Sequence, residues 1–378
     1  MDLKALLQNC ESDLDAMLSC LRQAVEIESP SRSKPDVDRM ANFFAGEFTR
    51  ARGKVKLLSH ATSGSALVAE FWGGKSNKPL LLLGHTDTVW DVGTLKRMPF
   101  LIKDGRAYGP GIFDMKAGIV CALWAIRALQ ALKVEPSRPV RCFLNSDEEV
   151  STVAFRTQLE KEATRSKAVL VLEPALGAAL KTARKGVGEF RITVHGRAAH
   201  AGVSPGSGVN AITELARQIL RIQSLTRPRR GITVNVGVIE GGTRGNVVPE
   251  RASALIDVRI PRAVDREWIE HQFQSLEPFH LEAKLEITGG INRPPMERHM
   301  AASLYRHAVR VGQEMGLGLL KEASTGGGSD GNFTAALGVP TLDGLGAVGD
   351  GAHALTEHVV ISELPRRAAL LAGLLATL

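Results

Sequence analysis

The sequence predicts an α/β protein in which a small domain is inserted into a larger one. Three observations favour this fold class. Short apolar runs alternate with helical patterns up to about residue 180, which is typical of a buried sheet flanked by helices. Alternating, half-exposed strands begin near residue 186, and the first pattern resumes after residue 289. We therefore expect one domain from residues 1–185 and 290–378, with a mixed sheet, and an inserted domain over residues 186–289.

The length and composition agree with two soluble globular domains. The chain has 378 residues, which is too long for one ordinary domain. Apolar residues make up 44% and charged residues 23% of the chain, as in soluble proteins.

The elements of the larger domain follow from hydrophobic periodicity. Amphipathic spacing predicts four helices in the first part, and near-continuous apolar runs predict four buried strands between them. After the insertion, the pattern predicts a helix, a strand and a last helix. The helices are expected near 3–27, 36–52, 115–132, 152–164, 301–316 and from about 361, and the strands at 66–72, 79–85, 140–146, 168–174 and 339–346.

The sequence predicts a split-βαβ arrangement for the inserted domain. Strand patterns with period-2 alternation and two amphipathic helices occur in the order βαββαβ within about 100 residues. The predicted strands are 186–196, 231–240, 251–260 and 281–289, and the predicted helices are 209–225 and 265–276.

Several function classes are disfavoured. The N-terminal segment has acids every few residues and helical periodicity, unlike a signal peptide, and no stretch approaches 18 apolar residues. The net charge is +7, but the basic residues are scattered and aromatic residues are only 5%, so we expect no nucleic acid partner. The four cysteines lack metal-site or disulfide spacing, which indicates free thiols. We expect a cytoplasmic protein that does not bind membranes.

Three polar residues in the first part could carry chemistry. His85 and Asp87 follow an apolar strand, and residues i and i+2 on extended chain face the same way. Asp87 could therefore fix the tautomer of a ligating His85. Asp114 begins a predicted helix in a Gly-rich turn, where a helix N-cap is the simpler interpretation.

Further acids end other apolar runs. The segment "NSDEEV" supplies Glu148 and Glu149 after the run 140–144, and "VLVLEPA" supplies Glu173. His353 lies in the Gly-rich segment "GDGAHALTEH". Each could be a solvated loop residue, and we interpret Asp147 as a solvated or helix-capping acid.

The conjunction of these residues favours a metal site. In α/β sheets, ligands gather at the carboxyl ends of the strands. Two histidines and at least three carboxylates converging there form a suitable set for two zinc-like ions with one bridging carboxylate. A non-catalytic metal-binding scaffold is the alternative from another class, and a zinc-dependent turnover assay would separate the two.

The motifs also resemble a known family. In order, "GHTDTV", "AYGPGIFDMKAG", "NSDEE", "VLEP", "AAHAG", "TGGGSD" and "GAHALTEHV" resemble those of the M20 metallopeptidases, with the glutamate carboxypeptidase branch most similar. The resemblance runs from about residue 25 to the end of the chain. Ala117 departs from the glycine often found in the family after the Met-Lys pair, and members of this branch are often exported.

The resemblance implies roles for the candidate residues. His85 and Glu173 would hold one zinc ion, Glu149 and His353 the other, and Asp114 would bridge them. Glu148 would be the general base and Asp87 would orient His85. A cis peptide bond would follow Asp114. Two Zn²⁺ are the expected cofactors, with Co²⁺ or Mn²⁺ as alternatives.

The resemblance also implies how substrate binds. The inserted domain would be a lid and dimerisation domain, and its His200 would reach an active site, within its own chain or across a homodimer. The expected substrate is a small N-acyl amino acid or short peptide, cleaved at the amide bond to a C-terminal glutamate or aspartate. The alternatives are an N-acyl-amino-acid deacylase, such as an acetylornithine deacetylase or desuccinylase, and a dipeptidase. The expected substrate-binding residues are His200, Asn246, Arg259, Arg293, Lys181, Thr325, Gly327 and Gly328.

Overall fold

The computed structural model describes residues 2–74 and 77–378. The chain divides into two compact units. The larger unit contains the residues up to 183 together with 298–325 and 329–378, and the smaller unit contains 184–297 and 326–328. The main segment of the smaller unit ends at residue 297, eight residues after the predicted end at 289. Its last strand alone continues to Arg293.

A mixed six-stranded sheet forms the centre of the larger unit, as predicted. Its strand order is β1-β2-β6-β3-β7-β14. The strands β6, β3, β7 and β14 run parallel, and β1 and β2 are antiparallel to their neighbours. The strands are β1 (Lys54–Leu58), β2 (Ala66–Phe71), β3 (Leu80–His85), β6 (Val140–Asn145), β7 (Ala168–Val171) and β14 (Thr341–Leu342). The sequence did not predict β1, whose residues are only partly buried.

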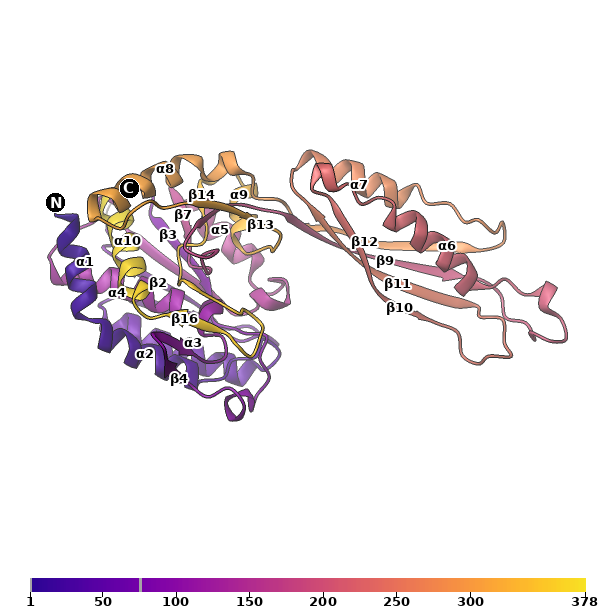
Figure 1. Cartoon of the computed structure of the whole chain (residues 1–378), viewed down its shortest axis with the longest axis horizontal. Coiled ribbons are helices and arrows are strands. Elements are labelled where there is room, and N and C mark those ends of the chain that lie inside the picture. The colour runs from indigo at the N-terminus through magenta and orange to yellow at the C-terminus, as the bar shows by residue number, and fades with distance from the viewer. Residues whose placement is uncertain (1, 75–76) are drawn as a thin grey trace. The chain divides into compact units, whose positions relative to one another are not determined.

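Helices cover both faces of this sheet (Figure 1). On one face, Leu81 and Leu83 of β3 pack with α5 (Arg156–Arg165) and α9 (Gly331–Ala336) in one apolar cluster. The helices α3 (Lys34–Arg50), α4 (Ala117–Ala131) and α10 (Glu363–Thr377) belong to the other side. All six residues of β3 are buried, which explains its continuous apolar run.

The predicted helix 3–27 is two helices, so that expectation was wrong. α1 (Leu3–Ser12) and α2 (Leu14–Glu26) are separated at Asp13, which has non-helical backbone angles. Both helices contact α4 and α10, and in addition α1 contacts α8 (Arg298–Met315), while α2 contacts the turn before α4. Asp2 caps α1 by accepting hydrogen bonds from two backbone N–H groups of its first turn.

Two small sheets were absent from the prediction. One has the order β15-β16-β5-β4, and the other pairs β13 with β8. Their strands are short, and most of their residues are partly or fully exposed. They are β4 (Leu101–Lys103), β5 (Arg106–Tyr108), β15 (Gly349–Asp350), β16 (His358–Val360), β8 (Leu180–Arg184) and β13 (Glu322–Thr325).

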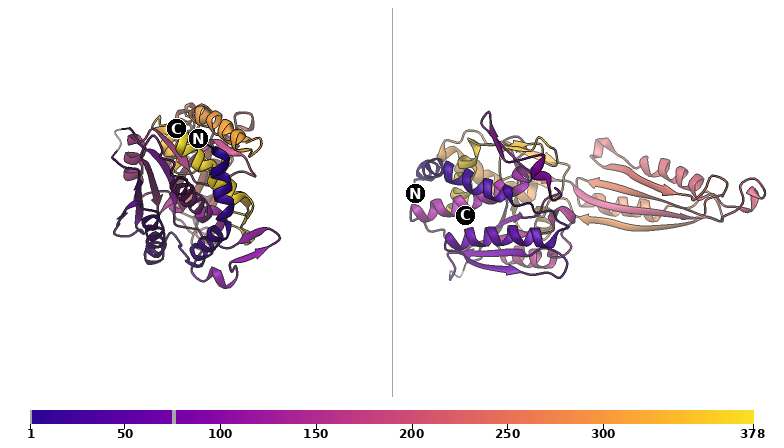
Figure 2. Two further views of the ribbon diagram at one scale, coloured as in Figure 1. Left: turned by 90° about the vertical axis from the view of Figure 1, so that its left-hand side faces the viewer. Right: turned by 90° about the horizontal axis from the view of Figure 1, so that it is seen from below.

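The smaller unit has the predicted βαββαβ order. Its antiparallel sheet has the strand order β10-β11-β9-β12. Both helices lie on one face of the sheet (Figures 1 and 2), where Phe190 and Phe273 stack with ring centroids 3.9 Å apart. The elements are β9 (Gly186–His195), α6 (Ala211–Gln223), β10 (Thr233–Gly241), β11 (Arg251–Ile260), α7 (Val264–Gln274) and β12 (Lys284–Arg293). The fold class predicted from sequence is therefore confirmed.

Among the residues that the structure describes, no helix combines the length and apolar character needed to cross a bilayer. The four cysteines are free and buried. Burial raises the pKa of the Cys10 and Cys20 thiols to about 12, so both are protonated at neutral pH.

Candidate metal centre

Three neighbouring parallel strands bring acids and a histidine to one edge of the large sheet. β3 lies between β6 and β7, with His85 in register with Asn145 and Leu83 in register with Val171. Glu149 follows β6, and Glu173 follows β7. Because parallel strands end at the same edge, these side chains lie close together.

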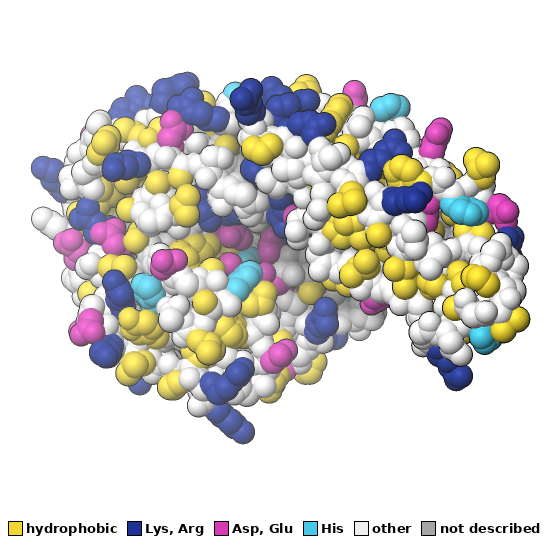
Figure 3. All heavy atoms as spheres, turned by 45° about the vertical axis from the view of Figure 1, so that its right-hand side comes forward, with side chains coloured by type: hydrophobic (Ala, Val, Ile, Leu, Met, Phe, Trp, Pro, Cys, Tyr) yellow, Lys and Arg dark blue, Asp and Glu magenta, His cyan; other side chains and the backbone are white. Residues whose placement is uncertain are grey.

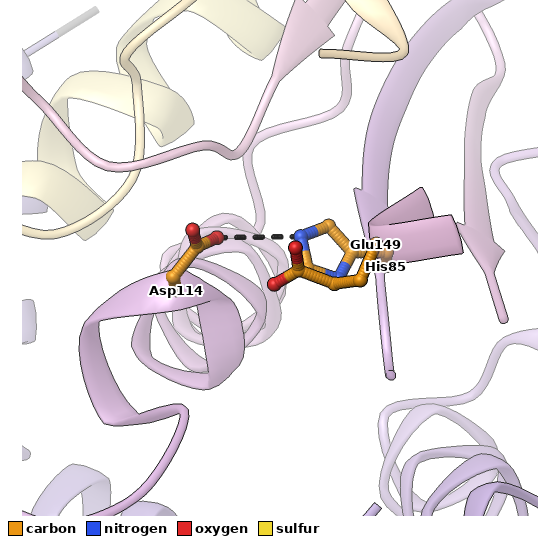
Figure 4. A group of neighbouring side chains, drawn as sticks. All are labelled: His85, Asp114 and Glu149. Atoms are coloured by element: carbon orange, nitrogen blue, oxygen red, sulfur yellow. Dashed lines mark ion pairs between the residues drawn. The ribbon is translucent and has the colours of Figure 1, made fainter. Parts of the chain in front are cut away.

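Asp114 approaches this edge from the turn Ile112–Lys116 before α4. Its carboxylate points toward the ring of His85, with the carboxylate of Glu149 beside them (Figure 4). Asp114 and Met115 leave the helical backbone angles, and the peptide bond between them is cis, as the resemblance implied. Asp114 does not cap α4, so the simpler interpretation of this residue was wrong.

The approach of α4 to the sheet depends on Gly118. A Cβ atom at this position would lie 2.1 Å from the carbonyl oxygen of Leu172, the residue before Glu173. Any side chain would therefore push the start of α4 away from the end of β7. The small residues after Asp114 thus allow the turn and the strand end to meet.

The two carboxylate oxygens of Asp114 face two different histidines. Oδ1 lies 3.3 Å from Nε2 of His85, and Oδ2 lies 3.4 Å from Nε2 of His353. The His85 nitrogen is also 3.5 Å from Oε1 of Glu173, and the His353 nitrogen is 3.3 Å from Oε1 of Glu149. Asp114 therefore lies between two histidine–glutamate pairs, His85 with Glu173 and His353 with Glu149.

The small sheet β15-β16-β5-β4 brings His353 to this position. β5 precedes the Asp114 turn, and β15 and β16 flank the loop that carries His353. Tyr108 is paired with His358 across β5 and β16. His353 has a positive φ of 62°, a strained backbone conformation that is common at functional sites.

Asp87 contacts both His85 and the turn after β6. The Nδ1 atom of His85 lies 2.9 Å from the backbone oxygen of Asp87 and 3.4 Å from its carboxylate. The carboxylate accepts hydrogen bonds from the backbone N–H groups of Glu148 and Glu149, each at 3.2 Å, and from Ser31 Oγ at 2.7 Å. Asp87 is fully buried.

The electrostatics of the cluster follow from its buried charges. Burial lowers the pKa of His85, but the nearby carboxylates of Asp114, Asp87 and Glu173 outweigh this effect and raise it well above its usual value. The carboxylates of Asp114 and Glu149 raise the pKa of His353 to about 10. Burial raises the pKa of Asp114, but the two histidines outweigh it and lower the pKa. The buried carboxylates thus favour positive charge in the cluster.

The residues fit a bound metal. Among the described residues, His85 Nε2, Asp114 Oδ1 and Glu149 Oε1 are buried atoms without a hydrogen-bond partner, and they face one another. Ligand atoms of His85, Asp114 and Glu149 lie within 4.8 Å of one another, as do those of His85, Glu148 and Glu173. Buried polar atoms need a compensating partner, and imidazole nitrogens with carboxylate oxygens suit zinc and similar ions.

The expected substrate-binding residues are divided between the two units. Lys181 in β8 is buried, and Thr325 ends β13, both in the larger unit. His200, Asn246, Arg259, Arg293, Gly327 and Gly328 belong to the smaller unit. His200 is exposed, and the backbone oxygen of the exposed Asn246 accepts a hydrogen bond from Ala201.

Arg259 is already paired inside the smaller unit. Its guanidinium donates to both carboxylate oxygens of Asp257 at 2.8–3.1 Å and to the carbonyl oxygen of Gly326 at 3.5 Å. Arg293 is buried. Arg184 donates hydrogen bonds to the carbonyl oxygens of Gly327 and Gly328 at 3.2 and 3.1 Å.

The structure also corrects the expectation for Asp147 and adds residues that the sequence reasoning missed. Asp147 is buried rather than solvated, and it accepts a hydrogen bond from Ala154 N at 2.6 Å, which holds a loop rather than a helix end. Asp330 accepts hydrogen bonds from Asn145 and Thr152 beside the same loop. Glu357, in the segment "GAHALTEHV", is also buried, although the sequence pattern assigns it no function.

The comparisons with known proteins agree on a family. The sequence model of "Peptidase family M20/M25/M40" matches residues 81–377. The chain is 30% identical to carboxypeptidase G2 of Pseudomonas sp. (strain RS-16), over 99% of this chain and 92% of that protein. It is 32% identical to the acetylornithine deacetylase of Myxococcus xanthus, over 49% of this chain and 50% of that protein.

The fold is also similar to solved structures. The aminopeptidase PepT of Bacillus cereus matches with a TM-score of 0.77 and 21% identity, over 96% of this chain and 98% of that chain. The family model and the carboxypeptidase G2 alignment each cover most of the sequence, and the predicted family is thereby confirmed: this chain is an enzyme of peptidase family M20, which comprises metallopeptidases and related amidohydrolases.

Proposed function

We propose that the protein is a two-zinc exopeptidase or amidohydrolase that cleaves the amide bond to a C-terminal amino acid, with glutamate or aspartate preferred. The observation that carries the proposal is the shared carboxylate of Asp114, whose two oxygens face His85 and His353. The relative named carboxypeptidase G2, aligned over 99% of the chain, supports the carboxypeptidase assignment.

In the proposed site, His85 and Glu173 would hold one ion, Glu149 and His353 would hold the other, and Asp114 would be shared by both. Zinc fits the nitrogen and oxygen donors, and Co²⁺ or Mn²⁺ are alternatives. Ions bound there would supply Lewis-acid chemistry, which polarises a carbonyl group and makes water acidic near neutral pH. Asp87 would keep His85 in the tautomer that presents Nε2 to an ion.

Glu148 would act as the general base. It lies next to Glu149 in the turn after β6, and its oxygen lies within 4.8 Å of ligand atoms of His85 and Glu173. From this position, Glu148 would accept a proton from the attacking water and then donate it to the leaving nitrogen. The hydrogen bond from its backbone N–H to Asp87 fixes the turn that carries it.

The proposed substrate-binding residues include two arginines. Arg259 and Arg293 would bind carboxylates of the released amino acid, because the arginine fork matches a carboxylate with two hydrogen bonds. The Arg259–Asp257 pair is partly exposed, with 30% and 44% of the side chains accessible, so a substrate carboxylate could replace Asp257 at small cost. Lys181 would supply a second cation, and Asn246, Thr325, Gly327 and Gly328 would supply further polar contacts.

His200 would donate a hydrogen bond to the substrate. Its Nδ1 atom accepts hydrogen bonds from the backbone N–H groups of Gly202 and Val203, each at 3.1 Å. These contacts favour the tautomer with its proton on Nε2, so that the exposed imidazole offers a donor. A donor of this kind could stabilise the oxyanion of the tetrahedral state.

A homodimer through the smaller unit is part of the proposal. β10 is an edge strand, and its exposed residues include Val238 and Ile239, with 49% and 57% of their surface accessible. Leu220 of the adjacent helix α6 is 71% exposed, and hydrophobic side chains gather on the visible face of this unit (Figure 3). An exposed apolar edge strand favours pairing with another strand, so a second copy is the proposed occupant. His200 could then serve the active site of its own chain or of the partner.

We also propose that the protein works in the cytoplasm, which is supported by its four free, buried thiols.

A substrate panel tests the proposed specificity. The zinc-loaded enzyme is incubated with N-acyl-glutamate, N-acyl-leucine and N-acetylornithine, with and without a chelator, and products are measured by mass spectrometry. We expect the glutamate compound to be cleaved fastest, and only with metal. Faster turnover of the ornithine compound would support the deacylase alternative, which the similarity to acetylornithine deacetylase favours. Faster turnover of the leucine compound would remove the preference for acidic residues.

A further inference from the structure

One fully buried carboxylate near the candidate metal centre has no part in the proposed reaction. Glu357 lies four residues after His353 and has 0% of its surface exposed. Its Oε1 atom accepts hydrogen bonds from the backbone N–H groups of Phe113 at 2.9 Å and Asp114 at 3.1 Å. Its Oε2 atom accepts from Gly111 N at 3.0 Å and from the indole Nε1 of Trp90 at 2.7 Å.

These four hydrogen bonds connect the three segments that carry His85, Asp114 and His353. Trp90 lies in the segment after His85, and Gly111 to Asp114 form the turn before α4. The backbone of Glu357 strengthens the same connection, because Gly109 N donates to its carbonyl oxygen at 3.5 Å and its own N–H donates to Ala354 at 2.9 Å.

The backbone N–H groups around Glu357 are suited to binding an anion. Backbone N–H groups that converge in a tight turn form a concave site for negative charge, and a buried carboxylate needs such donors to offset its lost hydration. Removing the carboxylate would leave three backbone N–H groups of the turn without their acceptor. The turn would then relax, and the Asp114 side chain would move with it.

We propose that Glu357 is a positioning residue, which fixes the Asp114 turn against the His85 and His353 segments so that both oxygens of Asp114 meet their histidines. The inference rests on the proposed metal site. Residues that orient metal ligands typically contribute about 10–100-fold to metal affinity, and Glu357 acts on the one ligand that both proposed ions share. Its loss should therefore weaken both metal sites together.

A second buried carboxylate provides a matched control. Glu214 in α6 accepts hydrogen bonds from the backbone N–H groups of Phe279 at 2.9 Å and His280 at 3.0 Å, and from Gln218 at 2.8 Å. It is 3% exposed and belongs to the smaller unit, whereas all the proposed metal ligands belong to the larger unit. Glu214→Gln thus removes the same kind of buried anion without touching the Asp114 turn.

The experiment measures zinc binding by the metal-free wild-type protein, Glu357→Gln and Glu214→Gln, with a competing chromophoric chelator, together with thermal unfolding. We expect Glu357→Gln to bind zinc about 10–100-fold more weakly, and added zinc to restore part of its activity. Glu214→Gln should lower the unfolding temperature but bind zinc as the wild type does. Trp90→Phe removes only the indole donor and should have a smaller effect than Glu357→Gln.

Each outcome decides a separate claim. Wild-type zinc affinity in Glu357→Gln, or an equal loss in Glu214→Gln, would overturn the positioning role. Absence of zinc binding by the wild type would instead overturn the proposed function. If Glu357→Gln does not fold, Glu357→Asp keeps the charge on a shorter side chain. An intermediate zinc affinity in that variant supports the inference, and wild-type affinity contradicts it.

Discussion

The backbone N–H of Glu148 donates a hydrogen bond to Oδ1 of Asp87, with 3.2 Å between the two atoms. The second oxygen of Asp87 accepts from Glu149 N at 3.2 Å. One buried carboxylate therefore holds both a proposed metal ligand and its proposed neighbouring base. This contact explains how two adjacent glutamates, which would point oppositely on a regular strand, can take different roles at one site.

Replacement of Glu148 by glutamine should abolish turnover while both metals stay bound. The change removes the proposed proton acceptor but no proposed ligand, so kcat should fall about 10²–10⁴-fold. Steady-state kinetics and elemental analysis of the purified variant check this. Glu149→Gln is the matched control and should lose metal. If Glu148→Gln loses an ion and Glu149→Gln keeps both, the two roles must be exchanged.

Chelation should inactivate the enzyme without unfolding it. The core of the larger unit packs without the cluster, but Asp114, Glu149 and Glu173 need a cation to offset their mutual repulsion. Re-added zinc at about 100 times its Kd should raise stability by about 2.7 kcal/mol. Activity, circular dichroism and the unfolding temperature are measured before and after dialysis against chelator. Full activity in protein verified to be metal-free would contradict the proposal.

A mixture of two inactive variants tests whether His200 acts across a dimer. Glu148→Gln subunits keep an intact His200, and His200→Ala subunits keep an intact base. If His200 acts in the partner's site, mixed dimers should contain one complete site and recover activity. Each variant alone, unfolded and refolded in the same way, is the control. No recovery in dimers shown to be mixed would mean that His200 acts within its own chain or not at all.

The stability of the smaller unit should depend on Asp265 and on pH. The Asp265 side chain is fully buried and forms ion pairs with Arg262 and Arg230. Burial raises the pKa of Asp265, but the two guanidinium groups outweigh it and lower the pKa. A lowered folded-state pKa gives stability above the unfolded-state value of about 3.9, and this stability is lost as the pH falls further.

Asp265→Asn should therefore cost about 1–3 kcal/mol at pH 7 and progressively less as the pH falls below about 3.9. Amide hydrogen exchange of α7, measured between pH 7 and pH 3 with correction for intrinsic rates, reports this unit separately. Glu282→Gln is the control, because the Arg197–Glu282 pair is more than half exposed and should contribute at most about 1 kcal/mol. Equal pH dependence in wild type and Asp265→Asn would contradict the assignment.

The sequence predicted the parts of the fold that have strong periodicity. β3, β6 and β7 are buried on both faces, so their apolar runs are continuous and easy to find. The break at Asp13 could not be predicted, because the helical spacing of apolar residues continues across it. Strands of two or three residues, such as β15, carry no pattern that distinguishes them from loops.

The candidate site was predictable where side chains follow strand ends. His85, Glu149 and Glu173 were found in this way, and the resemblance added the pairing with Asp114 and His353. The interactions of Glu357 were not predictable, because they are made with backbone N–H groups, which any residue offers. The Arg259–Asp257 pair agrees with the strand pattern of the sequence, since residues two apart on a strand share a face.

The discontinuous larger unit has a consequence for synthesis on the ribosome. α4 is complete at residue 131, but α10, which covers it, begins only at residue 363. At a synthesis rate of about 5–20 residues per second, the apolar surface of α4 stays uncovered for roughly 10–50 s before α10 is made. The smaller unit is almost one continuous segment and can fold during that interval. We therefore expect a nascent chain in which the smaller unit is folded while the larger unit is incomplete and exposes apolar surface. Chaperones bind intermediates of this kind.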